Sequence, residues 1–148
     1  MTQSDSFQKI LVVREKEKKQ RQKEYNKAID SFEEVATQLY TLLKKKEDVE
    51  SSYKQFLESP GPITTLSTHY SFLERIKTKI TQLEEKVKNA RKYMENEQSK
   101  LTEAHIEVKK FEKLIEQKHL KQLQKEKNEE TKLMDELSVI QFSYSEDR

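Results

Sequence analysis

The chain has 148 residues and a formal net charge of +2, with 29 basic and 27 acidic residues intermixed. Hydrophobic residues make up 32% of the chain and charged residues 38%. This composition has too few apolar residues for a compact multilayer core, and it fits either disorder or long helices with a narrow buried stripe. The near-neutral charge gives no case for nucleic-acid binding, and the absence of cysteine excludes disulfides and thiolate metal sites.

The first predicted element is a helix over about residues 6–58, which contain neither glycine nor proline. Alternating steps of four and three from Phe7 reach residues that are almost all apolar from Tyr25 onward. This seven-residue repeat is typical of a coiled coil with a left-handed supercoil. We call these positions the heptad core of the first helix: Phe7, Leu11, Arg14, Lys18, Arg21, Tyr25, Ala28, Phe32, Val35, Leu39, Leu42, Lys46, Val49, Tyr53 and Phe56. The three early charged positions weaken self-association near the start.

The second predicted element is a reversal of the chain over residues 59–67. The only glycine and both prolines of the sequence stand together here as Pro60-Gly61-Pro62. Proline lacks an amide donor and clashes inside a helix, so the first helix must end before this tripeptide. Gly61 can adopt the positive φ that a reversal needs. A straight helix pair kinked at this point is the alternative, but three such residues in a row favour the reversal.

The third predicted element is a helix over about residues 68–144. Residues 71–74 match a capping box, while Thr64 or Ser67 could cap an earlier start. The seven-residue repeat resumes in this helix, and nearly all of its positions are apolar from Leu73 onward. Its heptad core is His69, Leu73, Ile76, Ile80, Leu83, Val87, Ala90, Met94, Glu97, Leu101, Ala104, Val108, Phe111 and Ile115.

These elements predict an all-α fold, an antiparallel two-helix coiled-coil hairpin that forms one elongated domain over residues 1–148. A symmetric fold about the reversal places Phe7 opposite about His119. The longer C-terminal helix then projects past the N-terminus from about Leu120, by roughly 40 Å at 1.5 Å per residue. Apolar residues return near its end: Leu133, Met134, Leu137, Val139, Ile140, Phe142 and Tyr144. An unpaired apolar patch of this kind indicates a partner.

The sequence offers no candidate for catalysis, a cofactor or a metal ion, and we expect none. A single glycine between prolines cannot form a phosphate-binding loop. His69, His105 and His119 are too far apart to form a ligand pair within one helix. The longest apolar run near the start, residues 10–13, is too short for a signal peptide or a membrane span. We therefore expect a non-enzymatic cytoplasmic protein without direct membrane insertion.

Four stretches carry a resemblance to a known family: "FQKILVVREKEKKQ" at residues 7–20, "HYSFLERI" at 69–76, "IEVKKFEKLIEQK" at 106–118 and "KLMDELSVIQF" at 132–142. With the hairpin and the chain length, they resemble the bacterial flagellar FliJ family, a component of the flagellar type III export apparatus. The likeness spans most of the chain. It implies a coiled coil that resembles the central stalk of rotary ATPases.

The resemblance also implies partners. The terminal helical segments would bind the ring of the export ATPase hexamer, the middle of the hairpin would bind the export gate protein FlhA, and the protein would escort export chaperones at the cytoplasmic face of the membrane at the flagellar base. For the ATPase it points to Phe7, Ile10, Leu11, Leu133, Met134, Leu137 and Ile140. For the gate, the family patterns Gln-x3-Leu-x2-Tyr-x3-Tyr and Phe-x3-Leu-x2-Ala-x3-His point to Gln38, Leu42, Phe72, Ile76 and Leu83. Ile76 replaces the pattern's Leu conservatively, whereas Lys45, Val49, Lys79 and Leu83 depart from the patterns.

Two other functions fit the same physical features. One is the stalk protein of a virulence-type injectisome. The other is a generic coiled-coil tether or chaperone that holds its clients near "SPGPITT", residues 59–65. We expect the isolated chain to be a monomer, with a self-associated four-helix dimer as the alternative.

Overall fold

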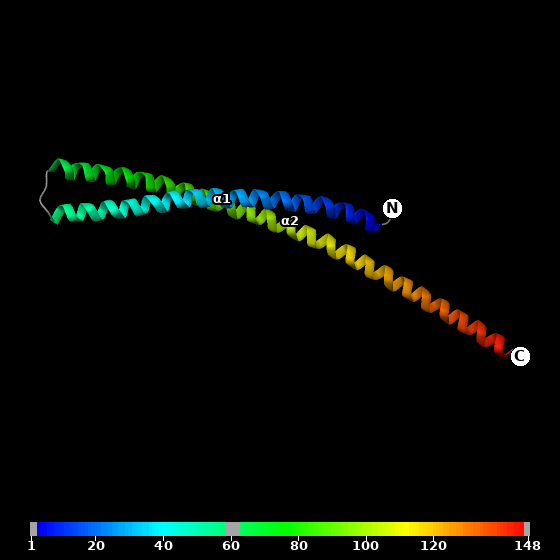
Figure 1. The fold of residues 1–148 in the computed structure, drawn as a ribbon. Helices are drawn as coiled ribbons and strands as arrows, with labels where there is room; N and C mark the ends of the chain where they lie inside the picture. The colour runs from blue at the N-terminus through cyan, green and yellow to red at the C-terminus, as the bar shows by residue number, and fades with distance from the viewer. Residues whose placement is uncertain (1–2, 59–62, 147–148) are drawn as a thin grey trace. The chain divides into compact units, whose positions relative to one another are not determined.

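The computed structural model describes residues 3–58 and 63–146, and these residues form two helices, α1 (Gln3–Glu58) and α2 (Ile63–Glu146) (Figure 1). No strand occurs within the described ranges. The two helices pack against each other, which confirms the predicted all-α helical hairpin. The tripeptide Pro60-Gly61-Pro62, to which we assigned the reversal, lies outside the described residues.

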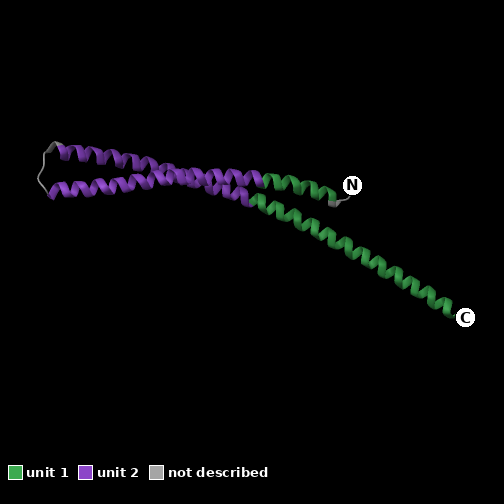
Figure 2. Ribbon diagram, in the orientation of Figure 1, with its two compact units in different colours: residues 1–18, 103–148 green, residues 19–102 purple. Residues whose placement is uncertain are grey.

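The helices contribute to two compact units (Figure 2), of which the larger spans residues 19–102. In this unit α1 and α2 run antiparallel, because contacts between them join residues progressively farther from the reversal. Phe56 lies against His69, with their ring centroids 5.9 Å apart. Farther along, the Arg91 guanidinium lies 5.7 Å from the centroid of the Phe32 ring. Among the described residues of this unit, three apolar side chains are buried: Ala28, Ile76 and Ile80.

Helix α2 begins at Ile63 and not near residue 68 as predicted. Ser71, the first residue of the predicted capping box, therefore lies inside the helix and cannot cap it. Packing explains the early start, since Leu66 and His69 are both half-buried and extend the apolar contact of α2 toward the reversal. Nothing in the sequence from Ile63 to Ser71 breaks a helix.

The other unit comprises residues 1–18 and 103–148 (Figure 2). The Phe7 ring contacts that of Phe111, with centroids 6.1 Å apart, and the Lys118 Nζ atom lies 4.8 Å from the Phe7 centroid. Phe7 thus lies between Phe111 and Lys118, about one helical turn before its predicted neighbour His119. The early start of α2 explains this shift, because it moves the point about which the two helices are symmetric toward the N-terminus.

The predicted heptad core is the contact surface of both helices. Every residue assigned to it is buried or half-buried except Arg21, which is exposed. Most positions are only half-buried, as expected where two helices share a core without a third layer. In the unit of residues 1–18 and 103–148, Val108 is also buried, with 3% of its surface exposed.

The heptad core holds five charged residues, Arg14, Lys18, Arg21, Lys46 and Glu97. Glu97 is 4% exposed and accepts a 3.2 Å hydrogen bond from Lys100 on the same helix. Arg14 is half-buried, donates from Nη1 to Glu17, and places Nε 3.9 Å from a carboxylate oxygen of Glu107 on α2. Its Nε atom makes no hydrogen bond in the described part of the chain. Arg14 makes the core near the start of α1 more polar than the core around Ile76, while Glu97 adds a buried charge to the larger unit.

Neither α1 nor α2, over the residues described, contains a stretch long and apolar enough to cross a membrane.

Candidate functional site

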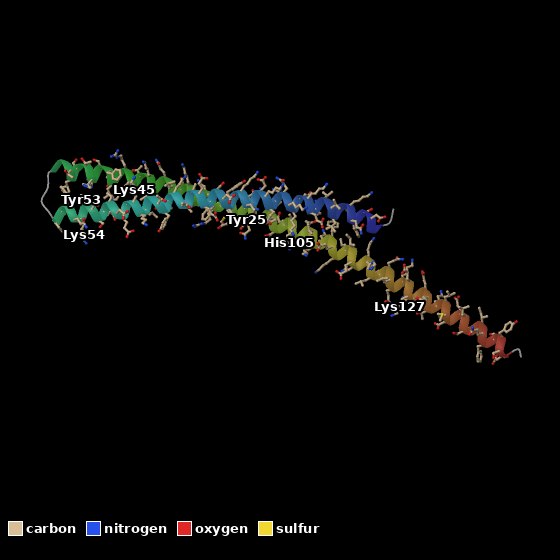
Figure 3. All side chains as sticks on the ribbon, in the orientation of Figure 1. Tyr25, Lys45, Tyr53, Lys54, His105 and Lys127 are labelled. Atoms are coloured by element: carbon tan, nitrogen blue, oxygen red, sulfur yellow. The ribbon has the colours of Figure 1, made fainter. Side chains whose placement is uncertain are left out.

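The first candidate surface is the part of α2 that runs past its contacts with α1, which we call the distal segment (residues 119–146). Each of these residues is exposed, and Figure 3 shows Lys127 within this segment. The four residues predicted here for the ATPase contact are largely open to solvent: Leu133 is 56%, Met134 61%, Leu137 47% and Ile140 61% exposed. Leu133, Leu137 and Ile140 follow each other at steps of four and three, so they lie on one face of the helix.

In the polar first half of the distal segment, hydrogen bonds between side chains one turn apart stabilise the helix. Gln122 donates to Glu126 and Gln124 donates to Asn128, each over 3.2 Å and one helical turn apart. Pairs of this kind contribute about 0.2–0.5 kcal/mol each to a helix. The helix therefore carries the apolar residues at its end without support from packing.

The predicted ATPase residues on α1 have a different environment. Phe7, Ile10 and Leu11 are half-buried, and Phe7 packs on Phe111 as described above. Part of their apolar surface is therefore already used within the chain. The next two residues, Val12 and Val13, are about half exposed and were missed by the sequence analysis. The sequence could have identified these two residues as exposed apolar positions, because they follow Leu11 and lie outside the heptad core.

The five predicted gate residues also divide into two groups. Ile76 is 3% exposed, and Leu42 and Leu83 are half-buried, so these three side chains are part of the heptad core of the hairpin. Gln38 is exposed and Phe72 is half-buried outside the core. Gln38 immediately precedes core residue Leu39, and Phe72 precedes core residue Leu73. In an antiparallel pair, positions related in this way flank the core on the same side.

Two cations that sequence reasoning did not assign to the site lie near the Phe72 ring. The Nζ atom of Lys45, which comes from α1 (Figure 3), is 5.3 Å from the Phe72 ring centroid. Arg75, one turn along α2, places its guanidinium carbon 5.7 Å from the same centroid. A shallow groove beside the ring is lined by Thr65, Thr68, His69, Phe72 and Arg75. The sequence could have identified Lys45 and Arg75 as candidates, because both immediately precede a heptad core residue.

The described residues contain no group of three or more His, Cys, Asp or Glu side chains placed to hold a metal ion. What the two surfaces offer is apolar area and charge for contact with another macromolecule.

Comparison with known proteins identifies the family of the chain. The model of the family described as "Flagellar FliJ protein" matches residues 3–147. A Flagellar FliJ protein from Bacillus subtilis (strain 168) is 35% identical over 136 residues, which cover 92% of this chain and 92% of that protein. No solved structure matches the chain. Since the family model covers nearly the whole chain and the relative aligns over almost its full length, this protein belongs to the flagellar FliJ family.

Proposed function

We propose that the protein is a non-catalytic adapter and stalk component of a flagellar type III export apparatus. In this role the distal segment and the start of α1 bind inside the ring of the export ATPase hexamer. Binding that favours the assembled hexamer would raise its activity by mass action, without any chemical step on this chain.

The distal segment is the observation that carries the proposal. Its helix leaves apolar residues 47–61% exposed at the predicted ATPase positions. Burying a Leu, Ile or Met side chain contributes about 1.5–3 kcal/mol, so four half-exposed side chains can supply several kcal/mol to a complex. A helix that presents a row of such residues fits an apolar groove or the bore of a ring.

We further propose that the export gate protein FlhA binds the hairpin around Phe72 and Gln38, and that the protein escorts export chaperones. Leu42, Ile76 and Leu83 then act through the hairpin, because their side chains hold α1 and α2 together. These contacts would place the protein in the cytoplasm, peripherally at the membrane face of the flagellar base. The match to a flagellar family model supports this machine over a virulence-type injectisome.

We infer that the isolated chain is a monomer, since its heptad core is already covered by pairing within the chain. Sedimentation should then give a mass near 17.7 kDa. A mass twice as large would favour the four-helix dimer.

The ATPase contact is tested by stimulation of the purified cognate ATPase. Truncation after Lys132 removes the predicted apolar contacts, and we expect it to abolish stimulation while the remaining chain stays helical by circular dichroism. A full-length variant with Gln at Leu133, Met134, Leu137 and Ile140 should behave the same way, because Gln keeps the helix propensity and removes the apolar face.

The matched control carries Lys125→Ala and Glu129→Ala, two exposed polar positions in the same segment. This control should stimulate the ATPase as the parent does. Full stimulation by both the truncated chain and the Gln variant would refute the proposed ATPase contact.

A further inference from the structure

One side of the larger unit carries cations around an aromatic ring. Lys45, Phe72, Arg75 and Lys79 each immediately precede a heptad core residue, and we call these four residues the Phe72 face. Lys45 and Arg75 lie 5.3 and 5.7 Å from the Phe72 ring centroid. Lys79 is exposed and follows Arg75 by four residues on the same stripe of α2.

These three cations have no carboxylate partner among the residues that the structure describes. Nearby cations in the same unit do have one: Lys46 pairs with Glu50 and Lys77 with Glu74, each at 3.7 Å. Asp48 is the acidic residue at the next flanking position of α1 after Lys45. It forms no ion pair with the Phe72 face, which therefore keeps an excess of positive charge.

The ring and the cations also support one another. A cation near an aromatic face is attracted by the ring quadrupole, and the long apolar stems of Lys and Arg can cover the ring while the charged groups stay in water. Phe72 is thus half-buried, with a positive charge from each of the two helices, Lys45 of α1 and Arg75 of α2, near its ring. An arrangement of this kind provides an apolar anchor with a charged rim.

We propose that the Phe72 face binds an acidic segment of the export gate, in which an apolar side chain contacts Phe72 and flanking carboxylates pair with Lys45, Arg75 and Lys79. This inference rests on the proposed docking of the gate and adds the chemistry that the docking segment must have. Charge complementarity selects the acidic occupant, because a basic segment would place like charges beside three unpaired cations. The shallow groove along Thr65, Thr68 and His69 gives the apolar side chain a place beside the ring.

The test measures the affinity of the full chain for the purified cytoplasmic part of its cognate export gate. Lys45→Glu with Arg75→Glu should weaken binding about tenfold or more, since like charges then meet at the contact. The neutral variant, Lys45→Gln with Arg75→Gln, should weaken it less and should also reduce the loss of affinity between about 50 and about 500 mM salt. Circular dichroism verifies that each variant remains helical.

The matched control is Lys54→Glu with Lys88→Glu, which makes the same change in net charge. Both lysines are exposed and immediately follow heptad core residues, so they lie on the opposite side of the same unit. The control should bind the gate like the parent chain. Equal weakening by the control would overturn the inference, because only net charge would then matter.

The remaining outcomes separate the inference from the proposed function. If the parent chain binds the gate and neither the reversed nor the neutral variant loses affinity, the acidic-segment inference is overturned while gate docking stands. If the parent chain does not bind the gate at any salt concentration, gate docking and the inference both fail, and the ATPase contact is judged by its own experiment.

Discussion

Replacing Ile76 by Ala separates the two roles that this position could have, as a core residue or as a contact for the gate. The side chain is 3% exposed, so truncation removes three buried carbon atoms, Cγ1, Cγ2 and Cδ1. At about 0.8 kcal/mol for each buried carbon, the loss is about 2.4 kcal/mol. A two-helix core can collapse around the missing atoms, so we add little for a cavity and expect a total near 2–3 kcal/mol.

The free energy of unfolding is measured by urea titration followed by circular dichroism. Ile76→Ala should lower the urea midpoint and leave the slope unchanged, because the surface exposed on unfolding is nearly the same. Ile106→Ala is the matched control: it is the same substitution on α2 at a side chain that is 57% exposed. This control should change stability by less than about 0.5 kcal/mol.

An unchanged midpoint for Ile76→Ala, together with lost gate binding, would refute the reasoning. It would mean that Ile76 faces a partner and that the pairing of α1 with α2 differs from the one described. A lowered midpoint with gate binding retained below the transition would instead place Ile76 in the core alone.

Three other predictions concern the start of α1, the polar core and the distal segment. Phe7→Ala removes the ring contact with Phe111 and should speed amide exchange in the first turns of α1 about tenfold, a loss of about 1.4 kcal/mol, whereas Phe142→Ala, at a ring that is 66% exposed, should leave those rates unchanged. Glu97→Leu should raise the urea midpoint, with a gain of about 1 kcal/mol, because it replaces a buried carboxylate in an apolar core; a lowered midpoint would show that its ion pair with Lys100 is net stabilising. Amides of the distal segment should exchange faster than those of the paired part of α2, since no packing protects them, and equal protection would contradict the exposure described here.

Periodicity made the helical hairpin and its heptad core predictable from the sequence. A core between two helices has one repeating pattern, and residues such as Phe32, Leu73 and Val108 stand at its positions whichever way the helices pair. Arg21 shows the limit of the pattern. Its long charged side chain reaches solvent from a core position, as such side chains do at the edge of a helix pair.

Pairing across the hairpin was not predictable to the same precision. The start of α2 depends on packing by Leu66 and His69, and that start determines which residue of α1 meets which residue of α2. An error of about one turn leaves the core positions unchanged but alters every contact between the helices. For this reason the sequence identified Phe72 as a candidate and missed Lys45, which lies over its ring.

The family was identifiable from short stretches in both helices, and the match to residues 3–147 confirms it. The gate contact of the candidate residues stays a prediction, and three of them, Leu42, Ile76 and Leu83, lie at the heptad core positions that the repeat assigns to them. A motif names positions, but Ile76 shows that a motif residue can be buried in the core of the hairpin that displays the motif.

The order of contacts along the hairpin has a consequence for synthesis of the protein. Phe56 and His69 need only a short stretch of chain to meet, whereas Phe7 and Phe111 meet only after most of the intervening polypeptide has been made. The entropic cost of closing a loop rises with its length. Pairing of α1 with α2 therefore starts beside the reversal and proceeds toward the N-terminus of α1. Until α2 has been synthesised, the apolar stripe of α1 is exposed to solvent. During that interval the nascent chain is most prone to aggregation and most dependent on a chaperone.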